Sequence, residues 1–325
     1  MCPSRSTSST STTSWPSPSK PRNPQQVTSP PPDEPRRARY VVIGAAGQLG
    51  FDLVRTFDRP GEVVALTRRE LDVLDAGRVR AVLADLRPTC VVNTAAYNRV
   101  DQAEDDRESA FALNARAVEA LAATCQALGA TFVHFSTDYV FDGRRSAPYR
   151  ESDAANPLNV YGESKLEGER LALARCERVV IFRVAGLFGL AKSSGKGGTN
   201  FVETMLRLAR RGEPIRVVAD QVLGPSYTRD LALKIWRVLP RAAHPIYHLT
   251  NAGQTSWHGV ARRVFELAGV AAEVVPVTSA EFGARARRPA YSVLAHANLA
   301  VLGEDDLRPW DAALAAYVAE RAPSA

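Results

Sequence analysis

The strongest chemical signal in the sequence is a tyrosine followed four residues later by a lysine, in Tyr161-Gly-Glu-Ser-Lys165. On a helix these two positions share a face, so the phenol and the ammonium would project side by side. A phenol has a reference pKa of about 10, and a nearby ammonium lowers that pKa. The pair therefore predicts a proton donor together with the cation that tunes it. Taken alone, the spacing also fits a tyrosine ring packed on a lysine stem.

The loop before this pair carries hydroxyl and carboxyl groups. It reads Ser136-Thr137-Asp138-Tyr139-Val140-Phe141-Asp142-Gly143. The apolar run before it, residues 131–135, predicts a buried strand, and residues 90–93 predict another. In a parallel sheet, ligands bind beyond the carboxyl ends of the strands. The two loops after these strands, residues 94–101 and 136–143, are therefore expected at the same edge of the sheet. Tyr161 follows the second loop in the sequence.

A glycine-rich turn separates a predicted strand at residues 39–43 from a predicted helix. The turn consists of Gly44-Ala-Ala-Gly47-Gln48-Leu49-Gly50. A strand, a glycine turn and a helix in this order are typical of a dinucleotide-binding fold, in which the helix N-terminus faces the pyrophosphate. Three glycines at this spacing favour that interpretation over an ordinary strand-to-helix turn.

Two arginines, Arg68 and Arg69, follow the second predicted strand at residues 62–66. A dinucleotide fold often places an acid there, which binds the ribose hydroxyls of the adenosine. A guanidinium instead pairs with a phosphate through two parallel hydrogen bonds. The two arginines therefore favour NADPH as the cofactor, with NADH left open. The alternative is that both side chains simply face solvent.

The remaining segments continue to alternate between strands and helices. An apolar run at residues 179–183 predicts another strand, and an alanine-rich pattern over residues 110–128 predicts one long helix. This alternation predicts an α/β fold, a doubly wound parallel sheet of Rossmann type with helices on both faces. Short strands at residues 216–218 and 247–249, with helices at residues 200–211 and 258–267, predict a smaller C-terminal lobe.

The chain is accordingly divided into three parts. Residues 1–38 form a Ser/Thr/Pro-rich tail that we expect to be disordered. Residues 39–184 form the predicted NAD(P)-binding Rossmann domain, and residues 185–325 form mainly a substrate-binding lobe. Six of the 41 basic residues and two of the 35 acidic ones lie in residues 1–39, so most of the net charge of +6 belongs to the tail. The nearly neutral remainder gives no support for nucleic-acid binding.

The cysteines and histidines show no spacing typical of a metal or redox site. The sequence has four cysteines and five histidines, without a C-x-x-C or an H-E-x-x-H pattern. We therefore predict no required metal and a reducing, cytoplasmic compartment. No apolar run has the length that a membrane span requires, so we predict no membrane association.

A series of further motifs covers the sequence from about residue 40 to the end. They are the glycine turn, Leu71-Asp72-Val73, Asn93-Thr94-Ala95-Ala96-Tyr97, Val100-Asp101-x-x-Glu104, Leu113-Asn114, the loop at residues 136–143, the Tyr161 and Lys165 pair, Gly197-Gly198-Thr199-Asn200-Phe201-Val202, Asp220-Gln221, Asp230-Leu231-Ala232 and Arg288-Pro289-x-x-Ser292. In this order they resemble the extended short-chain dehydrogenase/reductases, and most closely the dTDP-4-dehydrorhamnose reductase family.

This resemblance implies roles for individual residues. Tyr161 would be the proton donor, and Lys165 would lower its pKa while holding the nicotinamide ribose. Thr137 would bond the reacting oxygen, and Asn114 would relay protons through water. The cofactor would be held by Gly44, Gly47, Gln48, Leu49, Gly50, Arg68, Arg69, Asp72, Val73, Ala95, Ala96 and Tyr97, together with the catalytic pair. The substrate, a dTDP-linked sugar, would contact Thr137, Asp138, Asn200 and Arg288, with Arg285 and Arg287 adding charge for its diphosphate.

Some positions depart from the family pattern. Members often carry a tryptophan shortly after the arginine that corresponds to Arg183, and none is present here. Asn98 replaces a threonine of the Ala-Ala-Tyr-Thr pattern. Some members bind magnesium through glutamates at a dimer interface, where Asp52 is a weak match. The resemblance leaves both a monomer and a homodimer open.

Three functions remain open from the sequence. The first is an NADPH-dependent reductase of a dTDP-linked 4-keto-6-deoxyhexose. The second is a nucleotide-sugar dehydratase or epimerase, although the dehydratase pattern Thr-Asp-Glu is Thr137-Asp138-Tyr139 here. The third is a non-catalytic, NADP-binding regulatory subunit that resembles the β subunit of methionine adenosyltransferase. The sequence leaves open the keto sugar, the stereochemistry of the product and whether residues 1–38 belong to the natural protein.

Overall fold

The computed structural model describes residues 39–57, 62–191 and 199–321. The tail predicted at residues 1–38 lies outside the described residues. Among the helices that are described, none is both long enough and apolar enough to cross a bilayer.

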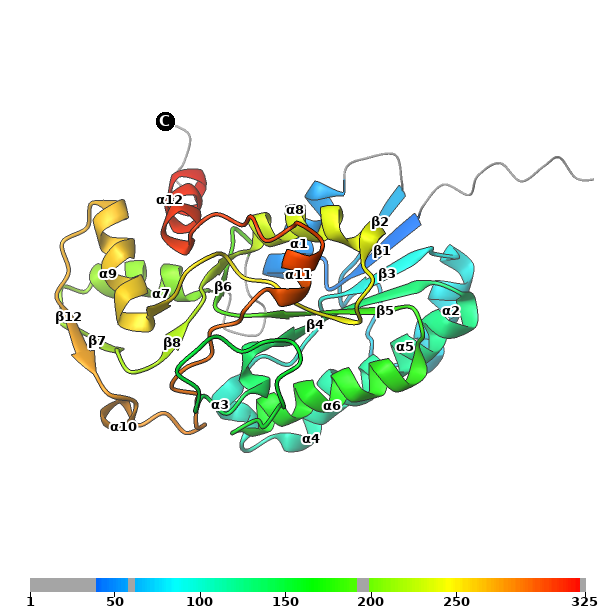
Figure 1. The fold of residues 1–325 in the computed structure, drawn as a ribbon, viewed down its shortest axis with the longest axis horizontal. Coiled ribbons are helices and arrows are strands. Elements are labelled where there is room, and N and C mark those ends of the chain that lie inside the picture. Colours follow the sequence, from blue (N-terminus) through cyan, green and yellow to red (C-terminus); the bar gives the residue numbers. More distant parts are fainter. Residues whose placement is uncertain (1–38, 58–61, 192–198, 322–325) are drawn as a thin grey trace, which may run out of the picture. The chain divides into compact units, whose positions relative to one another are not determined.

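A parallel sheet forms the centre of the described chain, with the strand order β10-β5-β4-β3-β1-β2 (Figure 1). Its strands are β1 (Arg39–Ile43), β2 (Glu62–Leu66), β3 (Cys90–Asn93), β4 (Thr131–Thr137), β5 (Val179–Val184) and β10 (Ile246–His248). Every residue of β3 and β5 is buried, as expected for β-branched runs covered on both faces. The strand order reverses at β1, so a crevice is expected where β1 and β3 end.

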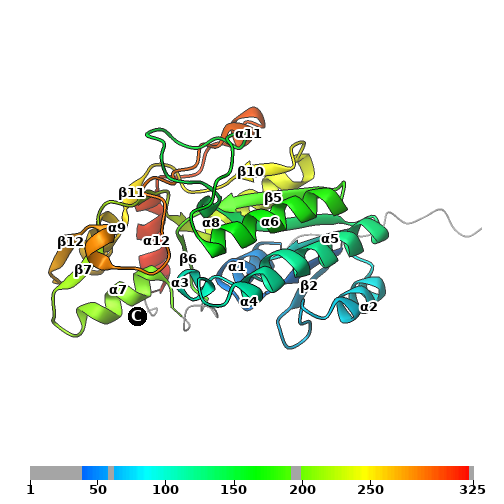
Figure 2. The ribbon, with the colours of Figure 1, turned by 90° about the horizontal axis from the view of Figure 1, so that it is seen from below.

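Helices cover both faces of this sheet (Figure 1 and Figure 2). One face carries α2 (Ala76–Leu86), α5 (Ala117–Leu128) and α6 (Val160–Arg175). The other face carries α1 (Gln48–Thr56), α8 (Thr228–Val238) and α11 (Ala297–Val301). Each helix turns an apolar stripe to the sheet, for example Leu121 and Cys125 of α5 and Leu231 and Ile235 of α8, all fully buried. The predicted doubly wound arrangement is therefore present.

The helix predicted over residues 110–128 is not a single α-helix. It consists of α4 (Arg107–Phe111), a π-helical turn η1 (Ala112–Arg116) and α5. The turn lies against α6 at Gly168, where a Cβ atom would come within 2.0 Å of the Asn114 carbonyl oxygen. This tight contact is specific to the tertiary structure, whereas an alanine-rich sequence favours an uninterrupted α-helix.

The strand predicted at residues 247–249 belongs to the central sheet and not to the smaller lobe. It is β10, which pairs in parallel with β5 at the edge of the sheet. Tyr247 is fully buried, and its ring packs on Phe182 of β5 with a centroid distance of 5.8 Å. A short apolar strand is recognisable in a sequence, but its partner is selected by the burial available in the folded chain.

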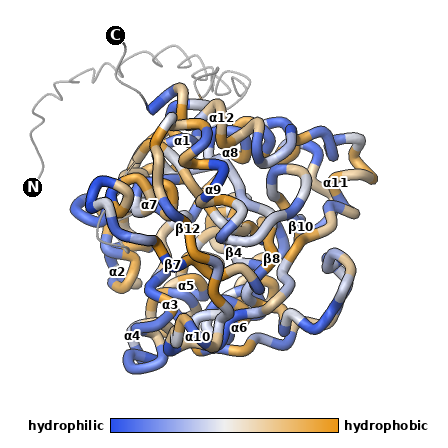
Figure 3. The backbone as a smooth tube through the Cα atoms, turned by 90° about the vertical axis from the view of Figure 1, so that its left-hand side faces the viewer, coloured by the Kyte–Doolittle hydropathy of each residue, from blue (hydrophilic) through white to orange (hydrophobic). Residues whose placement is uncertain are grey.

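The described part of the smaller lobe is built from short strands and from helices of different lengths. Its strands pair as β7 (Ile215–Val218) with β12 (Val274–Val277), β8 (Val222–Leu223) with β11 (Thr255–Ser256), and β6 (Leu187–Phe188) with β9 (Ser226–Tyr227). Its helices are α7 (Phe201–Ala209), α9 (Trp257–Ala268), α10 (Ser279–Phe282) and α12 (Trp310–Arg321). The tube in Figure 3 is orange along β12, whose valines are apolar. Short connecting helices are α3 (Val100–Ala103), η2 (Asp138–Val140) and η4 (Leu239–Arg241).

Candidate active site

A cavity of about 730 Å³ opens where the strand order reverses. Its lining comes from the glycine turn, from residues 67–74 after β2, from residues 94–99 after β3 and from α6. The sequence-predicted residues in the lining are Gly44, Gly47, Gln48, Leu49, Gly50, Arg68, Arg69, Asp72, Val73, Ala95, Ala96, Tyr97, Tyr161 and Lys165. Every residue predicted to hold the cofactor therefore faces one cavity, although these residues come from four separate segments.

Close backbone packing shapes the glycine turn. Gly44 has φ +79°, and a Cβ atom on it would lie 2.6 Å from Thr94 Oγ1. A Cβ atom on Gly50 would lie 2.4 Å from the Gly44 carbonyl oxygen. Gly47 forms the N-cap of α1, so the first backbone N–H groups of this helix stay available to an anion. The turn therefore has the shape and polarity that a pyrophosphate requires.

The two arginines after β2 lie at the exposed edge of the cavity. Arg68 makes a single contact of 3.3 Å with Asp72, and its side chain is 83% exposed. Arg69 is also exposed. A surface pair of this kind contributes little to stability, so its guanidinium can turn toward a phosphate at small cost.

The start of α6 positions Tyr161 in the first helical turn. Asn159 Oδ1 accepts a hydrogen bond from the Gly162 amide at 2.8 Å and caps the helix. Gly162 lies so close to the loop after β4 that a Cβ atom would sit 2.3 Å from the Tyr139 carbonyl oxygen. This contact holds Tyr161 against the loop that carries Thr137.

Burial controls the proton affinity of the Tyr161 phenol. Burial raises the pKa of Tyr161 to about 12. The hydrogen bond with Thr137 lowers this pKa, and the nearby Asp138 charge adds to the increase. The phenol therefore keeps its proton at neutral pH, as a proton donor must. The expected lowering by Lys165 is not among these causes, because the lysine amine points to β4, where it donates to the Phe135 carbonyl at 2.5 Å.

Thr137 and Asp138 form one end of a hydrogen-bond chain. Thr137 Oγ1 donates to Asp138 Oδ1 at 3.0 Å, and Ser292 Oγ donates to Asp138 Oδ2 at 2.6 Å. Asp138 is buried, so its carboxylate is held by two hydroxyl groups from different parts of the chain. Neither Thr137 nor Asp138 belongs to the lining of the cavity, although Thr137 shares a hydrogen bond with the Tyr161 phenol.

Asn114 connects the cavity wall to α6. Its Oδ1 accepts from the Tyr97 amide at 2.9 Å, and its Nδ2 donates to the Tyr97 carbonyl and to Ser164 Oγ, both at 2.9 Å. The side chain is fully buried. These bonds fix the position of Tyr97 relative to α6, in addition to any part that Asn114 takes in proton transfer.

Three residues predicted to contact the substrate or to add charge for its diphosphate are bonded to other residues of the protein. Arg288 forms a bidentate pair with Asp101, with distances of 3.0 and 2.7 Å. Arg285 pairs with Asp105. Asn200 caps α7 and donates to the Gly189 carbonyl and to Tyr317 Oη. Arg285 and Arg288 are therefore each paired with a carboxylate, which no local sequence pattern indicated.

Several lining residues were missed by the sequence analysis. Val184, the last residue of β5, and Leu187, the first residue of β6, line the cavity in the segment where the family often has a tryptophan. Ser109, Ala112 and Leu113 also line the cavity. They come from α4 and η1, and no local pattern distinguishes them from the rest of a helix that was predicted to be regular.

No metal centre is found in the described part of the chain, since no group of three or more His, Cys, Asp or Glu side chains is placed to hold an ion. Asp52, the weak match for a magnesium ligand, is fully buried. Its carboxylate accepts from Thr228 Oγ1 and from Arg55 Nε, and burial raises its pKa.

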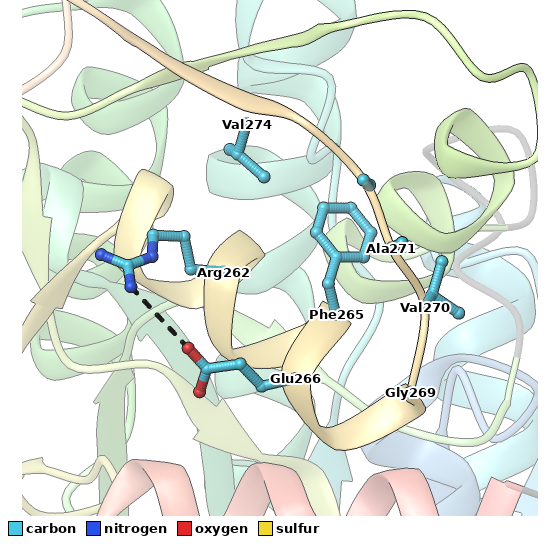
Figure 4. A pocket seen from close by; sticks show the side chains of 8 residues that line it. Arg262, Phe265, Glu266, Gly269, Val270, Ala271 and Val274 are labelled. Carbon is cyan, nitrogen blue, oxygen red and sulfur yellow. Dashed lines mark ion pairs between the residues drawn. The ribbon is translucent and has the colours of Figure 1, made fainter.

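A second pocket lies on the smaller lobe, at the end of α9 and the segment after it (Figure 4). Phe265, Val270 and Val274 supply apolar surface, and Arg262 and Glu266 form a long ion pair of 3.9 Å along its edge. It holds no tyrosine, cysteine or histidine. Of these two pockets, the first is the one lined by the residues predicted for catalysis and cofactor binding.

Comparisons with known proteins agree with this geometry. The model of the family described as RmlD substrate binding domain matches residues 38–322. The chain is 39% identical over 288 residues to the spore coat polysaccharide biosynthesis protein SpsK of Bacillus subtilis, covering 87% of this chain and 98% of that protein. It is 40% identical over 275 residues to a dTDP-4-dehydrorhamnose reductase of Burkholderia thailandensis, and the match covers 79% of this chain and 90% of that protein.

A solved structure gives the same result. A dTDP-4-dehydrorhamnose reductase from Bacillus anthracis, crystallised in complex with NADP, has a TM-score of 0.83 at 35% identity, covering 87% of this chain and 99% of that one. The predicted fold class and the predicted family resemblance are both confirmed.

Proposed function

The chain belongs to the RmlD substrate binding domain family, and on that premise we propose that it is an NADPH-dependent reductase of a nucleotide-sugar ketone. The substrate is a dTDP-linked 4-keto-6-deoxyhexose, and the reaction reduces its 4-keto group to a hydroxyl. One observation carries this proposal: all the residues predicted to hold the cofactor face a single cavity that also contains Tyr161 and Lys165.

The cavity fits a dinucleotide phosphate. The glycine turn would hold the pyrophosphate, with the first backbone N–H groups of α1 available to it. Arg68 and Arg69, at the exposed edge of the cavity, would bind the 2′-phosphate. When bound, NADPH supplies the hydride. The similar reductase crystallised with NADP supports this choice of cofactor.

The protein then supplies the proton and the orientation. Tyr161 Oη holds a proton at neutral pH and donates it to the carbonyl oxygen as the hydroxyl forms. Thr137, bonded to the same phenol, holds the Tyr161 side chain in place for this transfer. Val184 and Leu187 exclude water from the wall beside the reacting carbon.

Elimination or epimerisation is the weaker alternative. A dehydratase of this fold needs an acid at the position of Tyr139. This tyrosine packs edge-on against Tyr161 with a centroid distance of 5.9 Å, and burial raises its pKa, so it does not replace an ionised carboxylate as a base. Nothing in the described residues favours the regulatory-subunit function over catalysis.

The test is steady-state kinetics with a panel of dTDP-keto sugars. We expect NADPH oxidation with dTDP-4-dehydro-L-rhamnose or a close analogue, and a large loss of kcat/KM for the same sugar without its nucleotide. Remote binding of the nucleotide orients C4 at the cofactor, which a free sugar cannot exploit. Equal efficiency with the free sugar would contradict the proposed substrate class.

A further inference from the structure

The first turn of α6 decides where the Tyr161 phenol points, because Tyr161 is the second residue of this helix. The first N–H groups of a helix have no partner inside the helix, and helix ends fray when nothing holds them. Asn159 Oδ1 supplies a partner for the Gly162 amide. The Val160 amide, one residue before Tyr161, needs an acceptor from elsewhere in the chain. The group that accepts from it therefore takes part in fixing Tyr161.

Glu104 is the residue that accepts this hydrogen bond. The Val160 amide donates to Glu104 Oε1 at 2.9 Å, across 56 positions of sequence. Glu104 directly follows α3, which lies beside the start of α6 (Figure 1). A carboxylate at this place also meets the positive end of the helix dipole. Since Glu104 does not belong to the lining of the cavity, it can act on the site only through α6.

Asp101 of α3, three residues before Glu104, bonds a different segment. Its Oδ1 accepts from the Ala286 amide at 3.0 Å, and its two oxygens accept from Arg288 at 3.0 and 2.7 Å. Residues three apart on a helix lie on the same side. One short helix therefore bonds the smaller lobe through Asp101 and the start of α6 through Glu104.

We propose that Glu104 is a positioning residue for Tyr161, and that Asp101 links this role to the smaller lobe. Glu104 fixes the first turn of α6 and hence the direction of the Tyr161 phenol. Asp101 fixes α3 against residues 286–288, so a displacement of that segment moves α3 and Tyr161 together. The consequence for turnover rests on the proposed function, but the anchoring of α6 by Glu104 does not.

The residue that caps α6 is joined to the same lobe segment. Asn159 is buried, and while its Oδ1 accepts from the Gly162 amide, its Nδ2 donates to the Arg287 carbonyl at 2.7 Å. Both side chains that accept from the first turn, Asn159 and Glu104, therefore lead to residues 286–288, one directly and one through α3. This convergence supports a link between the lobe and Tyr161.

Hydrogen–deuterium exchange of the full chain tests the anchoring directly. In Glu104→Asp the carboxylate keeps its charge but is one methylene shorter, so it should no longer reach the Val160 amide. In Glu104→Gln the charge is lost, but the side-chain oxygen still accepts. We expect faster exchange in the first turn of α6 in Glu104→Asp and nearly wild-type exchange in Glu104→Gln. Unchanged exchange in Glu104→Asp would overturn the proposal without any assay of activity.

Turnover of a dTDP-linked 4-keto sugar tests the consequence for catalysis. We expect kcat of Glu104→Asp to fall about 10- to 100-fold, as for a displaced catalytic group, while the Kd for NADPH stays near that of the wild type. The solvent deuterium isotope effect on kcat should rise, because proton transfer from the displaced phenol becomes slower. Glu104→Gln should keep most of the wild-type kcat. A merely structural role would reduce the amount of folded protein and leave kcat and the isotope effect of the folded fraction unchanged, which would contradict the proposal.

Glu163→Ala is the matched control. Glu163 is the acidic residue of the same helical turn, and its carboxylate accepts from Arg107 Nη1 at 2.6 Å instead of from an amide of the turn. This pair is exposed, so its removal should have little effect on kcat or on exchange in α6. Equal losses of kcat in Glu163→Ala and Glu104→Asp would mean that the charge near the helix start matters and not the bond to Val160, and would refute the role of Glu104.

The double variant Asp101→Ala/Glu104→Asp tests the link to the lobe. If α3 joins the two bonds, the double variant should lose about as much kcat as the more impaired single variant. Losses that multiply would refute the link through Asp101. Should Glu104→Asp not fold, a folded Glu104→Gln with kcat reduced tenfold would still refute the role of Glu104, and wild-type kcat in it would support that role. Absence of turnover in the wild type would refute the proposed function, and the exchange measurement would still decide the anchoring.

Discussion

At the scale of single residues, burial of the Tyr161 phenol has a larger effect on its pKa than Lys165, the residue paired with it in the sequence pattern. Burial raises its pKa to about 12, so it is protonated across the neutral range. The lysine four residues later is bonded to β4. The i, i+4 spacing correctly predicts that both residues face one cavity, but it does not reveal where the lysine amine points, because that depends on β4.

The variant Tyr161→Phe should lose turnover by about 10²–10⁴-fold while binding NADPH almost as tightly as the wild type. The ring still packs against Tyr139, and only the transferable proton is removed. Steady-state kinetics and fluorescence titration with NADPH measure the two effects separately. Wild-type turnover in this variant would exclude Tyr161 as the proton donor.

Arg68→Ala, Arg69→Ala or the double variant should reduce the preference for NADPH over NADH. A charge-assisted hydrogen bond contributes about 1.5–3 kcal/mol, which corresponds to a tenfold or larger change in kcat/KM for NADPH. Arg80→Ala is a suitable control, because Arg80 is an exposed arginine on α2 outside the cavity. If the double variant keeps the wild-type ratio of efficiencies, the phosphate is bound elsewhere.

At the scale of elements, the hydrophobic pattern of the sequence predicted the strands and the positions of most helices. The exceptions arise from contacts between segments that are distant in the sequence. The π-helical turn η1 is set by its contact with Gly168, and β10 joins the sheet through Tyr247. The bidentate pair between Arg288 and Asp101 joins residues that are 187 positions apart, so no local sequence pattern predicts it. These features depend on which segments meet in space, and sequence patterns report mainly on local structure.

Gly168→Ala should destabilise the protein and weaken the cofactor cavity together. The added Cβ atom would lie 2.0 Å from the Asn114 carbonyl oxygen, so α6 or the π-helical turn must move. Overpacking of this kind costs about 1–3 kcal/mol. Denaturant unfolding and the KM for NADPH measure both effects.

Gly77→Ala is the matched control, because Gly77 lies in α2 with 3.3 Å between its Cβ position and Asp75 Oδ1. Alanine there should be neutral or stabilising by up to about 1 kcal/mol. Equal effects of the two substitutions would show that the contact with Asn114 has no structural role.

At the scale of the whole folded chain, the segment from residue 285 to residue 292 connects the smaller lobe to the loops of the candidate active site. Arg288 bonds Asp101, Ser292 bonds Asp138, and the Arg287 carbonyl accepts from Asn159 Nδ2 at 2.7 Å. These contacts hold the lobe beside the Tyr161 helix. The charge of Arg288 is therefore already paired with a carboxylate within the protein.

The pair between Arg288 and Asp101 should make stability depend on acidic pH. Hydrogen bonding by Arg288 lowers the pKa of Asp101, so the folded pKa lies below the unfolded value of about 3.9. Its contribution is therefore present above pH 4 and is lost as the pH falls through the folded pKa. A double-mutant cycle with Arg288→Ala and Asp101→Ala should give a coupling of about 0.5–3 kcal/mol at pH 7 that shrinks below pH 4. A coupling near zero at pH 7 would return Arg288 to the list of candidate substrate ligands.

The central claim is that this chain reduces a nucleotide-linked keto sugar with NADPH, and one measurement tests it most directly. The purified protein is mixed with NADPH and dTDP-4-dehydro-L-rhamnose, and NADPH loss is followed together with the appearance of the reduced dTDP-sugar. We predict one molecule of reduced sugar for each NADPH consumed, over many turnovers, and none with Tyr161→Phe. Tight binding of NADPH without oxidation by this or any other dTDP-linked 4-keto-6-deoxyhexose would contradict the account and favour a regulatory role.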